Sequence, residues 1–197
     1  MSKNTVSNFN LRMTVYCALF TALIIIGGYI SIPIPVGPVP IVLADFFVMI
    51  TGLFLGLKYG LISTALYLAL GALGMPVFAG GGAGLAVLVG PTGGFLFGYL
   101  LVVTSIGFIT GKRKPSIVTN LIALVVGNIL LYAIGVPWLK FQMNINWAAA
   151  LAAGLIPFII GIVIKITVAS ALGRVLLPRF KQTLVSASVQ QAEIGEE

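Results

Sequence analysis

The segment Gly74-Met-Pro-Val-Phe-Ala-Gly-Gly-Gly-Ala-Gly-Leu-Ala-Val-Leu-Val-Gly-Pro-Thr-Gly-Gly94 organises the rest of this chain. It is too rich in glycine and proline for a regular helix, because each interior glycine costs about 1 kcal/mol relative to alanine. It carries no charged side chain, so it is not a solvated linker. An irregular apolar segment between long apolar runs is stable where protein shields it at a membrane surface and its backbone lines a cavity. We therefore expect one wall of a small-molecule site here, formed by Phe78, Gly81, Gly82 and Gly84.

The composition is that of a polytopic membrane protein. Hydrophobic residues make up 59% of the 197 residues, charged residues 8%, and the mean hydropathy is +1.16, whereas soluble domains are about 25% charged. The formal net charge of +7 comes from basic residues spread between apolar runs, which argues against nucleic-acid binding. With no histidine and one cysteine, Cys17, the chain has few groups for acid–base, zinc or thiol chemistry. We expect no enzyme activity, no metal and no cofactor.

Apolar runs separated by breakers predict an all-α integral membrane protein with six transmembrane helices. The predicted spans are residues 11–30, 41–57, 61–73, 94–110, 116–134 and 147–177, and the last is long enough to include a kink at Pro157. The second and third are shorter than the roughly 20 residues of a straight span, so we expect tilted or partial crossings. Irregular segments rich in glycine or proline follow at residues 32–40, 74–94 and 135–146. The chain thus divides into an N-terminal segment, residues 1–10, a membrane domain, residues 11–181, and a polar tail, residues 182–197.

Loop charges predict the orientation in the cell membrane. Of the 11 Lys and Arg residues, all except Lys140 and the intramembrane Lys165 fall on one side of this topology. The positive-inside rule therefore places both termini in the cytoplasm and the three irregular segments outside. Three irregular outer segments above a helical bundle form a cap over a site that opens to the outside.

Two ionisable residues, Asp45 and Lys165, lie in apolar surroundings. Such residues are expensive in lipid, so they normally face the protein interior and mark a ligand or ion site. The alternative is that the two residues only pair with each other and hold the bundle together. For Lys165 we favour ligand binding, since an ammonium in a half-dry site is a natural partner for a ligand carboxylate. For Asp45 both alternatives stay open.

A small-residue pair, Ala18 and Ala22, lies in the first span. Residues four apart share one helix face, and two alanines there permit the close approach of another helix. The spacing alone favours packing within the bundle over contact with a partner protein.

The chain resembles the biotin-specific substrate-binding (S) component of an energy-coupling factor (ECF) transporter, the BioY family, over residues 12–180. The resemblance rests on Gly37-Pro-Val-Pro40 before Asp45-Phe-Phe47, on Gly74-Met-Pro-Val-Phe-Ala-Gly80 running to Gly90-Pro-Thr-Gly-Gly94, and on Pro157-Phe158, Gly161 and Lys165. It implies a six-helix membrane protein that captures biotin from outside and docks on a transmembrane coupling subunit driven by two cytoplasmic ATPases.

The resemblance also implies two residue roles. Ala18 and Ala22 would meet the coupling subunit, which raises the odds of a partner contact. The loop after the first span, with Pro35, Val36, Gly37 and Pro38, would act as a lid. Tyr132 is a further candidate for contact with the ligand.

Two positions depart from the family pattern. Ile162 stands where an acidic residue is usual, and Ala44 stands where a glutamine is usual. Both usual residues suit the ureido group of biotin, and a buried polar group without partners costs about 1–3 kcal/mol. Asp45 is able to replace one of them; otherwise the pocket favours lipoate, whose ring is apolar and whose acid chain is the same. We therefore expect biotin, with lipoate as the alternative ligand and an ion-coupled secondary transporter as the alternative class, although no inverted repeat is evident.

Overall fold

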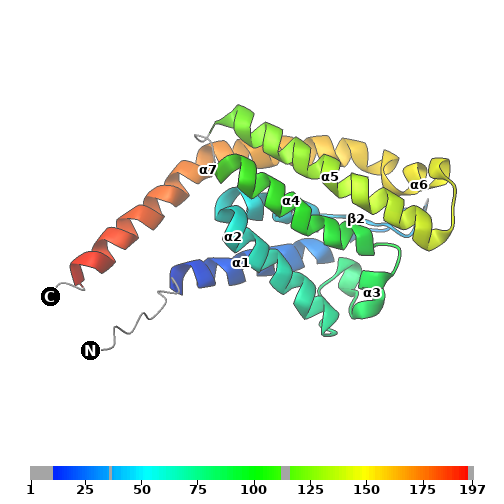
Figure 1. Ribbon diagram of the computed structural model, residues 1–197, viewed down its shortest axis with the longest axis horizontal. Helices are drawn as coiled ribbons and strands as arrows, with labels where there is room; N and C mark the ends of the chain where they lie inside the picture. The colour runs from blue at the N-terminus through cyan, green and yellow to red at the C-terminus, as the bar shows by residue number, and fades with distance from the viewer. Residues whose placement is uncertain (1–10, 36, 112–115, 195–197) are drawn as a thin grey trace.

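The computed structural model describes residues 11–35, 37–111 and 116–194, which form a bundle of long helices (Figure 1). The elements in chain order are α1 (Leu11–Tyr29), β1 (Ser31–Ile32), β2 (Ile41–Val42), α2 (Ala44–Ala72), η1 (Ala79–Gly81), α3 (Leu85–Val89), α4 (Gly93–Gly111), α5 (Ile117–Met143), α6 (Trp147–Gly154), η2 (Ile156–Phe158) and α7 (Ile159–Ile194). The two short strands pair antiparallel and close the loop between α1 and α2.

The helices have the length and surface of membrane spans. Among the described residues, five helical stretches are long and apolar enough to cross a bilayer: α1, α2, α4, α5 and Trp147–Phe180. Large apolar side chains such as Val15, Ile129 and Ile160 point outward from three of them and are more than half exposed. Side chains of this kind are stable on the outside of a protein only against lipid. The protein is an all-α integral membrane protein, as predicted.

Helix α2 contains both the second and the third predicted spans. Gly56 interrupts it with φ 67° and ψ −164°, a conformation that is essentially restricted to glycine. The chain reverses there, because a Cβ placed on Gly60 would lie 3.5 Å from the carbonyl oxygen of Thr51. In an unbroken helix the rise of about 1.5 Å per residue would hold these positions more than about 10 Å apart. The two arms, residues 44–55 and 57–72, therefore correspond to two spans, which agrees with the prediction of six helices.

The predicted end of the fifth span is wrong. Residues 135–143 are not a loop, because α5 continues through Pro137 to Met143 and ends at Asn144 in the left-handed conformation. Burial of Val136 and Leu139 on either side of the proline holds this extra length against the bundle. The final span breaks at η2, where Pro157 was expected to kink it, and η2 separates α6 from α7. Helix α7 then continues to Ile194, into the predicted tail.

Helix α4 lies at the centre of the bundle, between α2 and α5. Its residues Val103 and Ile106 are completely buried. Gly107 allows a close approach, because a Cβ there would overlap the backbone of Leu57 on the second arm of α2. Close packing of this type replaces the hydrophobic effect as the source of helix association in a membrane.

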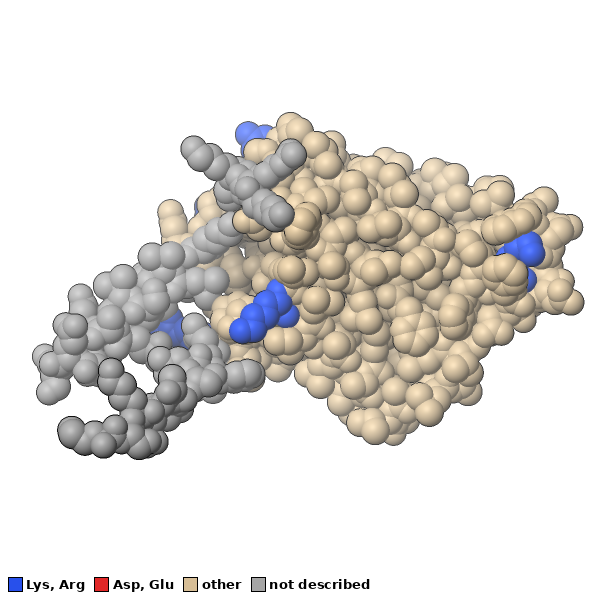
Figure 2. Space-filling view, in the orientation of Figure 1, with Lys and Arg blue, Asp and Glu red and all other residues tan. Residues whose placement is uncertain are grey.

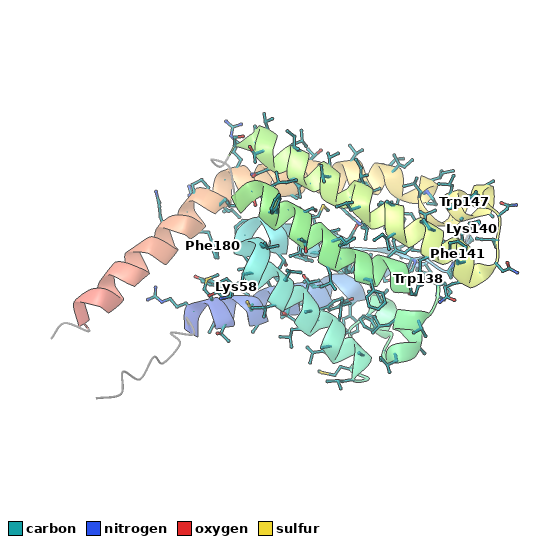
Figure 3. All side chains as sticks on the ribbon, viewed as in Figure 1. Lys58, Trp138, Lys140, Phe141, Trp147 and Phe180 are labelled. Atoms are coloured by element: carbon teal, nitrogen blue, oxygen red, sulfur yellow. The ribbon has the colours of Figure 1, made fainter. Side chains whose placement is uncertain are left out.

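The two ends of the bundle differ. The described chain begins and ends at one end, whereas the β2 loop, α3 and the α5–α6 turn lie at the other, here called the loop end (Figure 1). A group of aromatic side chains surrounds a lysine at the loop end: Trp138, Lys140, Phe141 and Trp147 (Figure 3). The Nζ of Lys140 lies 4.8 Å from the ring centre of Phe141 and 5.2 Å from that of Trp147. Aromatic and cationic side chains collect in this way where a membrane meets water. The surface between the two ends is almost free of charge on the face that Figure 2 shows.

Candidate functional site

Two adjoining cavities lie beneath residues 38–42 at the loop end, with volumes of ≈ 230 Å³ and ≈ 40 Å³. The residues that line both are Val39, Pro40, Val42, Phe95 and Tyr99. Because the cavities share these walls, we treat them as one site with two ends. The polar end is the smaller cavity and contains Asp45 and Lys165. The glycine end is the larger cavity and contains Phe78 and Gly82.

Asp45 and Lys165 meet at the polar end although they come from distant parts of the chain. Asp45 lies in the first turn of α2, directly after β2, where a carboxylate interacts favourably with the helix N-terminus. Lys165 lies early in α7, after the break at η2 has redirected the chain. The Nζ of Lys165 is 2.7 Å from Oδ1 and 2.9 Å from Oδ2 of Asp45. The two residues therefore pair with each other, which was the alternative to ligand binding in the sequence analysis.

The surroundings of this ion pair are dry and aromatic. The side chains of Lys165 and Asp45 are only 12% and 9% exposed. The rings of Phe95 and Tyr132 pack edge to face at 5.9 Å between centroids, and both line the smaller cavity. A low-dielectric site of this kind strengthens every hydrogen bond made in it and penalises any charge left without a partner.

The glycine-rich segment forms the far wall. Phe78 and Gly82 line the larger cavity, and Phe78 is 1% exposed. A Cβ on Gly71 of α2 would overlap the ring of Phe78, so that glycine makes room for the ring. Gly81 and Gly84 do not line either cavity. Their φ angles of 84° and 86° shape the turn that presents Gly82.

Side chains from α1 and α5 hold this segment in place. The hydroxyl of Tyr29 donates a hydrogen bond to the carbonyl of Pro76, and the side-chain amide of Gln142 donates one to the carbonyl of Val89. The indole N–H of Trp138 donates to the carbonyl of Gly90 at 2.9 Å. The part of α5 that the sequence analysis assigned to a loop thus anchors the wall of the site.

Of the predicted lid residues 35–38, one lies against the site. Pro38 lines the larger cavity. Gly37 packs on α6, where a Cβ placed on it would be 2.7 Å from the Cβ of Ala153. Pro35 is exposed, and Val36 lies outside the described residues.

Ala44, Ile162 and Tyr132 are placed differently from one another. Ala44 is buried at the start of α2 and lines neither cavity of the site. Ile162 lines a separate apolar cavity of ≈ 520 Å³ between α5, α6 and α7. Tyr132 lines both that cavity and the polar end. The two positions that depart from the family pattern are therefore not in the wall next to the ion pair.

Sequence analysis missed the contribution of α4. Phe95 and Tyr99 are one helical turn apart, so they share a face, and they line both cavities. The signal in the sequence is this aromatic pair just after Gly93-Gly94, where the helix begins beside the glycine-rich segment. Thr92 and Phe158 also line the site and were missed.

Ala18 and Ala22 do not pack inside the bundle. Both are exposed on the outer face of α1, together with Val15 and Leu19. The interpretation of this pair as intramolecular packing is therefore wrong for the described chain, and a smooth strip of small side chains faces outward.

The fold and the site together define an integral membrane protein with a cavity and a buried ion pair near one membrane surface. Comparison with known proteins identifies the family of this membrane protein. The profile of the BioY family matches residues 1–182, and the chain belongs to this family. Members of this family are S components of transporters rather than enzymes.

The relatives are similar over most of their length. The chain is 43% identical over 160 residues to the biotin transporter BioY of Thermotoga maritima, covering 81% of this chain and 92% of the relative. It is 42% identical over 148 residues to a probable biotin transporter BioY of Pyrococcus horikoshii, covering 75% and 85%. The crystal structure of the S-component for biotin from an ECF-type ABC transporter superposes with a TM-score of 0.80 at 38% identity, covering 86% of this chain and 93% of that chain.

Proposed function

We propose that the protein is the substrate-capturing S component of an ECF-type vitamin importer in the cell membrane, and that it binds biotin from outside the cell. The observation that carries the proposal is the site at the loop end, where an apolar cavity meets one buried ion pair, in a chain of the BioY family. A mostly apolar cavity with few polar groups suits a ligand that has an apolar body and a polar head.

Lipoate finds less support than biotin. The relatives compared above are named as biotin transporters or biotin S-components. The sequence argument for lipoate depended on the loss of polar groups at Ala44 and Ile162, and neither residue lines the cavities beside the ion pair. Asp45 supplies a hydrogen-bond acceptor there instead.

Partner subunits supply the energy in this proposal. The exposed Ala18 and Ala22 on α1 offer a smooth face for a transmembrane coupling subunit, and two cytoplasmic ATPases drive that subunit. The excess of Lys and Arg at the end that carries the termini supports a cytoplasmic position for that end, with the site open to the outside.

A binding experiment tests the proposal. The protein, purified in detergent without biotin in the medium, is titrated with biotin and with lipoate by calorimetry. We expect biotin to bind at least tenfold more tightly than lipoate, a difference of about 1.4 kcal/mol. Thr167→Ala, an exposed change two residues from Lys165 on α7, serves as the control and leaves both affinities unchanged. Tighter binding of lipoate would establish the alternative ligand, and binding of neither compound would refute the proposal.

A further inference from the structure

The apolar cavity between α5, α6 and α7, here called the side groove, is a second hollow of the molecule, with a volume of ≈ 520 Å³. Its lining includes Val125, Ile129 and Pro137 of α5 and Trp147 at the start of α6. Ile129 and Trp147 are more than half exposed, so the groove opens on the surface of the bundle that faces lipid. Of the described residues, only Tyr132 lines both the side groove and the site at the loop end.

The side groove suits an apolar chain better than it suits water. None of its lining residues is charged, and apart from Asn128, Tyr132 and Trp147 they have purely aliphatic side chains. A buried water needs two to four polar partners, whereas an apolar hollow stays dry and binds apolar molecules. Asn128 and Tyr132 are too few to hold the water that would fill this volume.

The length of the side groove matches one leaflet of a bilayer. Along α5 its lining runs from Val125 to Pro137, which at about 1.5 Å per residue covers roughly 18 Å. The hydrocarbon core of a membrane is about 30 Å thick, so one leaflet contributes about 15 Å. The side groove therefore has the depth of a lipid chain in the leaflet at the loop end.

A single ammonium group lies at the mouth of the side groove. Lys140 follows Pro137 by about one turn of α5, and its Nζ is 5.2 Å from the ring centre of Trp147, next to which Figure 3 shows it. In the described part of the chain the only ion pair is that of Lys165 and Asp45, so Lys140 has no carboxylate partner. The ring contact leaves its N–H groups able to donate to a phosphate, which an ammonium binds as a point charge.

We propose that the side groove holds one chain of an anionic phospholipid whose phosphate group binds Lys140. The loop end supplies no competing anion, because residues 31–42, 73–94 and 141–147 contain no Asp or Glu. For the same reason a second copy of this chain has no carboxylate in these segments to offer Lys140, which favours a lipid over a dimer. This inference goes beyond the proposed function and is independent of which molecule the site at the loop end takes.

The first test measures the headgroup preference. Lipid-free protein in detergent is titrated with phosphatidylglycerol and with phosphatidylcholine of the same chains, and bound lipid is counted by native mass spectrometry. We expect the first phosphatidylglycerol to bind at least about fivefold more tightly, and Lys140→Gln to bring the two lipids within about twofold. No preference in the parent protein, or a preference that survives in Lys140→Gln, overturns the inference.

Lys58→Gln is the matched control for the headgroup. Lys58 also lies over a ring, with its Nζ 5.4 Å from the ring centre of Tyr59, but it is away from the loop end and from the side groove (Figure 3). We expect Lys58→Gln to retain the preference for phosphatidylglycerol. An equal loss in Lys58→Gln and Lys140→Gln would show only a general attraction between charges, and it would overturn the inference.

The second test fills the side groove. Ala133 is exposed and lines the groove, so Ala133→Trp occupies the space of the lipid chain, and we expect the affinity for both lipids to fall by about tenfold. Ile160→Trp, a change at a 75% exposed position of α7 outside the groove, is the control. Unchanged lipid binding in Ala133→Trp overturns the inference, and Lys140→Gln decides alone if Ala133→Trp does not fold.

Two further results of the same measurements would assign the side groove to another occupant. Glycerol phosphate carries the headgroup charge without the chains, and we expect it not to displace the lipid. Displacement by glycerol phosphate would show that the groove takes no part in binding. A mass of two protein chains that Ala133→Trp reduces to one would assign the groove to a second copy of this chain. Either result overturns the inference.

Discussion

Replacing Lys165 with methionine removes both hydrogen bonds from the ammonium to Asp45 and leaves its carboxylate in the bundle with the bond from the backbone N–H of Phe46. Asp45 is 7% exposed, so water does not replace the lost ammonium. Removing one partner of a buried ion pair costs about 3–5 kcal/mol, because the other charge stays buried. For a chain of this length, about 1 kcal/mol shifts the melting temperature by about 2–4 °C. We therefore expect Lys165→Met to lower the melting temperature by about 6–20 °C.

Thermal unfolding of the purified protein in detergent, without ligand, measures this effect. Asp45→Leu combined with Lys165→Met replaces the whole pair by apolar side chains, and such replacements are often neutral or stabilising. We expect the double variant to melt at least as high as Lys165→Met, and close to the parent. A melting temperature within about 2 °C of the parent for Lys165→Met alone, less than 1 kcal/mol, would refute the buried ion pair.

Two further predictions concern α1 and two glycines. Ala18→Leu with Ala22→Leu leaves biotin affinity of the isolated protein within about twofold, because both side chains are exposed, but abolishes uptake in cells that express the coupling subunits. Ala171→Leu, an exposed change on α7, is the control, and an equal loss of affinity and uptake would exclude a coupling role for α1. Gly56→Ala lowers the free energy of unfolding by about 1–3 kcal/mol because the φ angle of Gly56 is 67°. Gly161→Ala, with no atom within 4 Å of the added Cβ, is the control, and equal melting temperatures of the two variants would contradict the strained backbone at Gly56.

Sequence analysis identified most of the site because membrane proteins carry few polar groups. Asp45 and Lys165 stood out as the intramembrane ionisable residues, and a charge in lipid has to find a protein partner. The glycine-rich segment was recognisable as a wall because no helix accepts so many glycines. Phe78 and Gly82 line the cavity, whereas Gly81 and Gly84 only shape the turn. Spacing along the chain does not distinguish those two roles.

The least accurate predictions were those that depend on tertiary contacts. Pro137 reads as a helix breaker, yet α5 continues to Met143 because its neighbours are buried against the bundle. The same extra length places Trp138 where it anchors Gly90. Ile162 lies three residues before Lys165, but the helix turns it into a different cavity. Packing energy outweighs local propensity in each case.

The sequence by itself determined that this chain crosses a membrane, where most of its helices lie and which two charges they bury. Hydropathy and charge are properties of each single residue. A bilayer requires apolar side chains and excludes unpaired charges wherever it surrounds the chain, so these properties predict the spans without knowledge of tertiary contacts. Only the tertiary structure decided that Lys165 is already paired with Asp45 and that Ala18 and Ala22 face outward. These facts depend on which segments meet after Gly56 and η2 redirect the chain, since Asp45 and Lys165 are 120 positions apart in the sequence.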